Sequence, residues 1–117
     1  MRLKAGIWIK AYIRRCASEG VPAVVVRHGD DDAGAIFIRV NCLDGTSLLF
    51  GPAPAGLDES QADRPMMRMF DGRAVPDEGV DEFLARQRGF DSDLWIVEVE
   101  ARDGRHFLDD WIFTATR

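Results

Sequence analysis

Residues 23–51 carry the strongest fold signal in the chain, in the sequence AVVVRHGDDDAGAIFIRVNCLDGTSLLFG. A β-branched run at 24–26 favours extended backbone, because side chains branched at Cβ keep more freedom in a strand than in a helix. Apolar residues at 36, 38 and 40 alternate with other positions, which is the period of a strand with one buried face. Residues 47–50 predict a third strand, which the Gly-Pro pair that follows it ends.

Two turns join these predicted strands. Residues 29–34, GDDDAG, tolerate positive φ and cap their own backbone, a composition typical of a connection between antiparallel strands. Asp44 and Gly45 form a hairpin dipeptide, because glycine accepts the left-handed backbone that a type I′ turn requires. The stretch therefore predicts a three-stranded antiparallel meander.

Two periodicities compete over residues 4–18. Apolar residues at odd positions from 3 to 13 alternate as in a strand, whereas those at 8, 9, 12, 13, 16 and 17 recur at helical spacing. The helix is favoured because the segment exceeds the usual length of a strand and Gly20 lies where a helix C-cap is expected. Ile7 would then lie on the polar side of the helix and form a small exposed apolar spot.

A second helix and a C-terminal hairpin are expected after the meander. Pro76 and Asp77 open the helix, and Gly89 ends it. Residues 94–100 predict a strand that starts buried on both faces. The dipeptide at 103–104, Asp-Gly, predicts a turn back into a short last strand.

These elements predict one α+β domain over residues 1–117, in the order α-β-β-β-α-β-β. We expect an antiparallel five-stranded sheet, made of the meander and the C-terminal hairpin, with two helices covering one face. Residues 52–75 are expected to be loop-rich, and their apolar patch at 66–70 is either core packing or an adaptable binding surface. Residues 110–117 form a tail that either docks on the domain or contacts a partner.

The composition is that of a globular protein, with 46% hydrophobic and 30% charged residues. The apolar runs are far shorter than the roughly 20 residues that a membrane span requires, and no cleavable targeting segment is recognisable. We therefore expect a cytoplasmic protein without membrane contact. Cys16 and Cys42 lack the short spacing of a metal or redox pair and are interpreted as reduced thiols in the core.

Charge is distributed unevenly along the chain. Residues 1–28 contain six basic residues and one acidic residue, whereas the whole chain has a net charge of −5. Lys10, Arg14 and Arg15 would share the polar side of the first helix and form a basic face. This face is either a solvated helix surface or the best candidate binding surface in the chain. As a binding surface it suits an acidic protein partner or, less favourably, nucleic acid, because a nucleic-acid-binding domain is usually basic overall.

The remaining acidic, histidine and serine residues form no pattern that predicts a reaction. Asp30, Asp31 and Asp32 lack the alternating spacing of a calcium loop and are interpreted as a solvated turn. His28 and His106 have no ligand spacing with the cysteines, and no serine lies in a nucleophile motif. We therefore expect no metal, no cofactor and no catalytic residue, and an enzyme is the weaker class.

Five segments resemble, in order and spacing, the bacterial family described as domain of unknown function (DUF) 1491. They are GIWIKAYIRRC, AGAIFIRVN, LDGTSLLFGPAP, FDSDLWIVEVE and GRHFLD. The resemblance spans roughly residues 2–109 and implies a short bacterial cytoplasmic protein. It implies no assigned activity, so no functional residue is carried over from it.

The expected function is a small protein-interaction or regulatory module with an unidentified protein partner. Homodimerisation, through a sheet edge or through the Trp and Met side chains, remains an alternative. Two further classes stay open, a ligand-sensing domain and a small enzyme, each with a pocket near the long loop. An enzyme would require His28 or His106 to meet carboxylates in a deep pocket.

Overall fold

The computed structural model describes residues 3–54 and 64–109, and every structural statement below refers to them. The predicted tail at 110–117 and residues 55–63 of the predicted loop-rich segment lie outside the described residues. In chain order the elements are α1 (Ala5–Ser18), β1 (Ala23–Arg27), β2 (Ile36–Asn41), β3 (Thr46–Pro52), β4 (Met66–Arg68), the 3-10 turn η1 (Phe70–Gly72), β5 (Val75–Pro76), α2 (Asp77–Phe90) and β6 (Trp95–Glu100).

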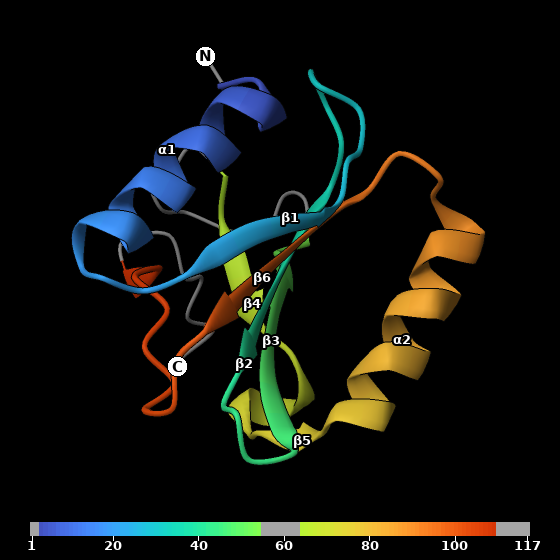
Figure 1. Ribbon diagram of the computed structural model, residues 1–117. Helices are drawn as coiled ribbons and strands as arrows, with labels where there is room; N and C mark the ends of the chain where they lie inside the picture. The colour runs from blue at the N-terminus through green and yellow to red at the C-terminus, as the bar shows by residue number, and fades with distance from the viewer. Residues whose placement is uncertain (1–2, 55–63, 110–117) are drawn as a thin grey trace, which may run out of the picture.

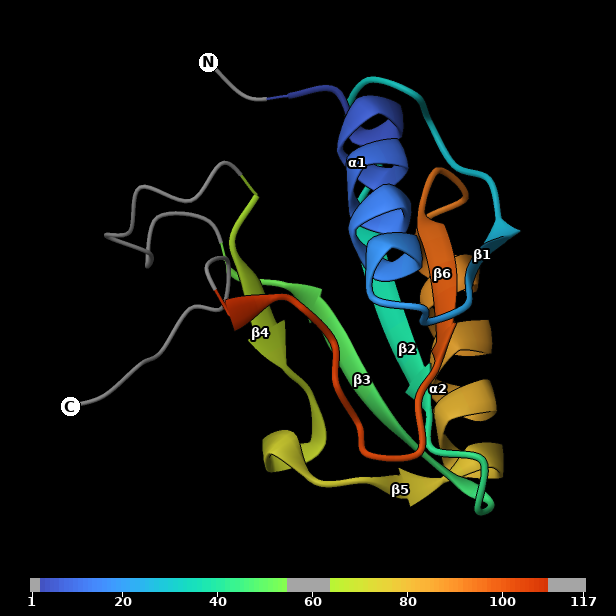
Figure 2. The same ribbon diagram turned by 60° about the vertical axis from the view of Figure 1, so that its left-hand side comes forward.

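The strands form one mixed sheet in the order β1-β6-β2-β3-β4, with the two-residue strand β5 paired to β3. The β2–β3 hairpin is antiparallel and turns at Gly45, whose φ of 91° is readily accessible only to glycine. Strand β6 pairs antiparallel with β1 and parallel with β2. Figure 2 shows β6 between β1 and β2, with β1 at the outer edge.

The expected five-stranded antiparallel sheet is therefore wrong in two respects. The sheet has six strands, one pair of which is parallel, and β1 does not pair with β2 as a meander requires. The reason is that β6 is buried on both faces over Trp95 to Val97, so its side chains favour the middle of the sheet over an edge. The hairpin prediction at Asp44 and Gly45 is confirmed, whereas the acidic segment 29–34 connects strands that are not neighbours.

The two helices lie on opposite faces of the sheet, as Figure 1 shows. Helix α1 packs Trp8, Ile9 and Tyr12 into a core that includes Ile38 and Val97. The opposite core is smaller and is built from the following side chains: Phe37, Leu49, Val80, Leu84, Leu94 and Ile96. The expectation that both helices cover one face is therefore wrong. Because the central strands have apolar side chains on both faces, each face needs a helix of its own.

The predicted C-terminal hairpin is also absent from the described residues. A turn does occur at Gly104, whose φ is 76°, but residues 105–108 form no strand. Both edges of β6 are already occupied by β1 and β2, so no hydrogen-bonding edge is left for a strand that folds back. The segment instead crosses to α1, where Leu108 is fully buried and the His106 carbonyl accepts a 2.7 Å hydrogen bond from Tyr12.

The helix predictions hold closely. Helix α1 ends just before Gly20, which has a φ of 74°, and Ile7 is 52% exposed on its polar side. Helix α2 begins after Pro76 and buries Val80 and Leu84. The patch at 66–70 is largely core, because Met66 is 2% exposed and Met69 packs on the α2 side of the sheet.

The segment between β1 and β2 caps the N-terminus of α1. The carbonyls of Asp31 and Asp32 accept hydrogen bonds from the Gly6 and Ala5 amides, at 3.0 and 3.2 Å. These amides belong to the first turn of the helix and have no partner within it. The acidic segment therefore acts as the N-terminal cap of α1 and fixes the distance between α1 and β1.

Candidate functional site

Strand β1 is the open edge of the sheet. On one side it pairs with β6, and no described strand pairs with its other side. Its three central residues are apolar and exposed, with Val24 and Val26 at 58% and Val25 at 39%. An exposed apolar edge strand is a template for pairing with another chain, which natural proteins usually block with charges or coverage.

The register of β1 shows which backbone groups are open. The Glu100 amide donates to the Pro22 carbonyl at 3.0 Å, so Pro22 and Glu100 form a hydrogen-bonded pair. In an antiparallel ladder such pairs alternate with pairs whose groups point away. Ala23 and Val25, opposite Val99 and Val97, therefore direct their N–H and C=O groups outward, away from β6.

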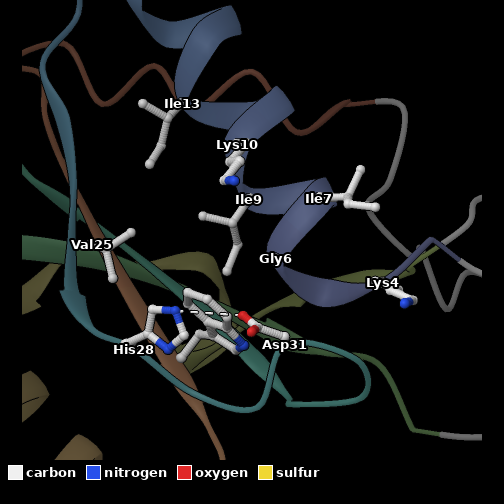
Figure 3. A pocket seen from close by; sticks show the side chains of 10 residues that line it. Lys4, Gly6, Ile7, Ile9, Lys10, Ile13, Val25, His28 and Asp31 are labelled. Atoms are coloured by element: carbon white, nitrogen blue, oxygen red, sulfur yellow. Dashed lines mark ion pairs between the residues drawn. The ribbon is translucent and has the colours of Figure 1, made fainter.

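A groove lies between this edge and α1, with a volume of about 400 Å³. We call it the α1/β1 groove. Figure 3 shows Ile9 and Ile13 extending from α1 toward Val25 of β1. The remaining lining residues are Lys4, Gly6, Ile7, Lys10, His28, Asp31 and Trp95. The groove is thus mainly apolar and has an open hydrogen-bonding edge along one wall.

One end of the groove is closed by His28 and Asp31. Their side chains are 3.5 Å apart, from Nε2 to Oδ1, and 66% and 73% exposed. The His28 ring packs on Trp95 with centroids 4.1 Å apart, and the Trp95 indole donates to the Asp30 carbonyl at 2.7 Å. This is the histidine–carboxylate meeting that an enzyme would require, but both groups are open to solvent and no described serine or cysteine lines the groove.

The three predicted binding residues are all exposed on α1, but they are not equivalent. Lys10 lines the α1/β1 groove, and Arg14 lies one helical turn further along the same side. Neither forms an ion pair with a described carboxylate. Arg15, in contrast, pairs with Glu19 at 2.5 Å and lies over the Phe107 ring at 4.9 Å, so it is occupied by contacts within the chain.

A second, smaller groove flanks β1 on the α2 side. It measures about 220 Å³ and is lined by Val26, Leu84, Arg88, Ile96 and other residues of α2 and the sheet. Val25 thus faces one groove and Val26 the other. A strand added beside β1 would send its alternate side chains into the two grooves in turn.

The other residues that the sequence singled out have structural roles. Asp30 accepts hydrogen bonds from the Asp32 and Ala33 amides, at 3.1 and 2.8 Å, as a turn-forming side chain does. His106 accepts a 3.0 Å hydrogen bond at Nδ1 from the Leu108 amide and packs on Phe50. Burial lowers the pKa of His106, with the nearby Asp109 charge acting in the opposite direction.

The cysteines, possible metal ligands and possible membrane-spanning helices are described for residues 3–54 and 64–109. Cys16 is buried in the α1 core and Cys42 is half-buried, and neither forms a disulfide there. No described group of histidine, cysteine or acidic side chains is arranged to hold a metal ion. No described helix is both long and apolar enough to cross a membrane. The pocket expected beside the loop-rich segment involves residues 55–63, which lie outside the described part of the chain.

Sequence reasoning missed the residues that surround Lys10. Val25 lies in β1, the next element after α1, but Trp95 lies in β6, which is distant in sequence from both and pairs with β1. Two features of the sequence pointed toward this site: the apolar Ile7 on the polar side of the first helix, and the unbroken valine run at 24–26.

Together these features define a class of protein, an α+β domain with a mixed sheet between two helices and an open, groove-flanked edge. The chain belongs to the family described as protein of unknown function DUF1491, whose model matches residues 3–109. This confirms the family resemblance found in the sequence. No curated protein matches the chain.

Solved structures of relatives have the same fold. A DUF1491 family protein from Caulobacter crescentus CB15 is 36% identical, and its crystal structure has a TM-score of 0.78 over 97% of this chain and 100% of that one. An NMR structure of a DUF1491 family protein from the same bacterium gives a TM-score of 0.77 at 36% identity, over 97% of this chain and 99% of that one. A protein from A. tumefaciens, solved in solution, is 40% identical with a TM-score of 0.73, over 86% of this chain and 87% of that one.

Proposed function

We propose that this protein is an interaction module that binds an extended segment of another polypeptide as an additional strand along β1. The observation that carries the proposal is the outward-facing backbone of Ala23 and Val25 on an exposed apolar edge strand. In strand addition, the main-chain hydrogen bonds supply affinity and alternate side-chain pockets supply specificity. The grooves on the two sides of β1 provide such pockets.

The site is preorganised for this role. Helix α1 is anchored at its start by the Asp31 and Asp32 carbonyls, and β1 is held by its ladder to β6. The groove walls therefore keep their spacing without a bound segment, which lowers the ordering cost of binding. No part of this role requires a cofactor or a chemical step.

A small apolar ligand is the second candidate. It is supported by the volume of the α1/β1 groove, because small-molecule sites usually measure about 300–1,000 Å³. Such a ligand would use the side chains of Ile9, Ile13 and Val25 and would not need the open backbone. Nucleic acid is the least favoured partner, since the chain has a net charge of −5.

The test uses a short acetylated and amidated peptide in which valine and threonine alternate, titrated into the protein and followed by NMR. We expect weak saturable binding, with shifts centred on β1. Val25→Pro removes the outward N–H group and should abolish binding, whereas Val25→Ala keeps that group and should retain most of it. Proline is tolerated where an edge-strand N–H faces solvent, so the variant should fold.

A peptide N-methylated at alternate positions provides a test that needs no variant. Methylation in one of the two alternating sets blocks the amides that face β1 and should abolish binding, whereas methylation in the other set should not. Equal binding of both methylated peptides, or shifts that avoid β1, would contradict strand addition. Binding that survives Val25→Pro and fills only the groove would favour the small-ligand alternative.

A further inference from the structure

The α1/β1 groove has a charge polarity that restricts which segment it can accept. Lys10 lines the groove, Arg14 follows it one helical turn later, and neither forms an ion pair with a described carboxylate. Lys4, in contrast, is 3.7 Å from Asp32, and Arg15 is paired with Glu19. The other end of the groove carries the Asp31 carboxylate beside His28. The groove is therefore basic toward one end and acidic at the other.

The direction of β1 relates this polarity to the backbone. Helix α1 and β1 run in opposite directions, since the Asp31 and Asp32 carbonyls cap the start of α1 and Ala23 follows closely on its end. The basic end therefore lies beside the start of β1, near Ala23. A strand added antiparallel to β1, the more stable arrangement, has its C-terminal half at that end.

We infer, on the basis of the proposed function, that the partner is an extended segment with acidic residues in its C-terminal half, added antiparallel to β1 so that its carboxylates meet Lys10 and Arg14. Its other half is apolar or uncharged, because a carboxylate there would face Asp31. The inference rests on charge complementarity between these two cations and the segment.

A second copy of this chain fits the edge less well. Antiparallel pairing of β1 with itself produces a two-fold axis through the strand pair, perpendicular to the sheet. Both α1 helices would then lie on the same face beside that axis. Because Lys10 and Val25 line one groove, a pairing centred on Val25 would bring the like-charged Lys10 side chains of the two copies toward each other. An acidic foreign segment would supply carboxylates to the Lys10 ammonium group.

The test compares three peptides that share the alternating valine and threonine pattern. One is uncharged, one carries glutamates in its C-terminal half, and one carries the same glutamates in its N-terminal half. We expect the peptide with C-terminal glutamates to bind about five- to tenfold more tightly than the uncharged one, and this advantage to shrink at high salt. The peptide with N-terminal glutamates should show no such gain.

Two double variants with the same change in net charge test which cations cause the affinity advantage of the acidic peptide. Lys10→Glu with Arg14→Glu should remove the advantage of the acidic peptide over the uncharged one. Arg73→Glu with Arg86→Glu changes net charge equally at exposed positions away from the groove and should preserve the advantage. Both variants are exposed-surface changes, and circular dichroism verifies their folding.

The outcomes separate this inference from the function on which it rests. Binding of all three peptides with equal affinity, or equal losses in the two variants, would overturn the acidic partner while leaving strand addition intact. Failure of every peptide to bind would overturn both. Sedimentation that gives a dimer mass for the wild type and a monomer mass for Val25→Pro would assign the edge to a second copy and overturn the inference.

Discussion

The Arg64 guanidinium donates a 3.0 Å hydrogen bond from Nη2 to the backbone carbonyl of Asp32. Arg64 is only 3% exposed, and it also donates to the Leu3 carbonyl at 3.1 Å and the Gly34 carbonyl at 3.4 Å. The same Asp32 carbonyl accepts from Ala5 in the first turn of α1. One buried cation thus links the start of α1 to the acidic segment at the closed end of the groove.

Replacing this cation should destabilise the whole domain. We expect Arg64→Leu to lower the free energy of unfolding by about 2–4 kcal/mol, because buried carbonyls would lose hydrogen bonds to a charged donor. Urea unfolding followed by tryptophan fluorescence measures the change. Arg73→Leu, at a side chain that is 76% exposed, serves as the control and should leave stability nearly unchanged. Equal effects of the two substitutions would contradict the linking role of Arg64.

The two glycines of the acidic segment are expected to be irreplaceable for steric reasons. A Cβ on Gly29 would lie 2.2 Å from the Asp93 carbonyl oxygen, and one on Gly34 would lie 2.4 Å from the same atom. We expect Gly29→Ala to lower the free energy of unfolding by about 2–3 kcal/mol, because backbone must move.

Gly79 provides the matched control for this substitution. It lies in α2, and a Cβ there would meet no atom within 4 Å. Gly79→Ala should therefore raise the free energy of unfolding by about 0.5–1 kcal/mol through helix propensity. Opposite signs for the two variants in the same urea assay support the packing described here, and a neutral Gly29→Ala would contradict it.

Helix α2 is attached to the sheet by a polar network around Arg39. Its guanidinium pairs with Asp77 at 3.3 Å and with Asp81, and the fully buried Ser47 donates to Asp77 at 2.7 Å. Asp81 is 62% exposed, whereas Asp77 is 32% exposed. We expect a double-mutant cycle to give a coupling of about 1–2 kcal/mol for Arg39 with Asp77 and less than about 1 kcal/mol for Arg39 with Asp81. A larger coupling to Asp81 would show that burial does not decide the strength of these pairs.

Stability should depend on pH through His106. Burial lowers the pKa of this histidine below its ordinary value, and its Nδ1 accepts from the Leu108 amide only when it is unprotonated. Below the ordinary histidine pKa of about 6.5 the unfolded chain binds a proton that the folded chain resists, so this contribution to stability is lost as pH falls.

The measurement is the urea midpoint at pH 7.5 and 5.5, conditions chosen to lie on either side of about 6.5. The wild type should lose more stability between these conditions than His106→Gln, although the variant is less stable overall. Identical pH dependence in both proteins would show that His106 does not contribute through its protonation.

Local sequence patterns predicted most helices and strands well, but they predicted poorly which strands pair with each other. Alternation at Ile36, Ile38 and Val40 and the turn at Gly45 were sufficient for β2 and β3, because both depend on residues close in sequence. The insertion of β6 between β1 and β2 depends on contacts across about half the chain. The apolar run at 94–97 did indicate a strand buried on both faces, which is the property of a central parallel strand and should have outweighed the hairpin signal.

The candidate site was predictable only in part for the same reason. Lys10 and Arg14 were found from helical spacing alone, since their exposure follows from the face of α1 that packs inward. The involvement of Arg15 with Glu19 and Phe107 depends on where the segment after Gly104 crosses α1. The groove itself exists only because β1 is an edge strand, which no local pattern indicates.

Residue-resolved hydrogen exchange at β1 tests the central proposal most directly. The Val25 amide faces outward and should exchange quickly in the free protein, whereas the Val24 amide faces β6 and should be protected already. Addition of the peptide that carries C-terminal glutamates should slow amide exchange at Ala23 and Val25 progressively, up to a maximum at saturation. Exchange at Val24 should change little. Unchanged exchange at Val25 in the saturated complex would contradict strand addition along β1.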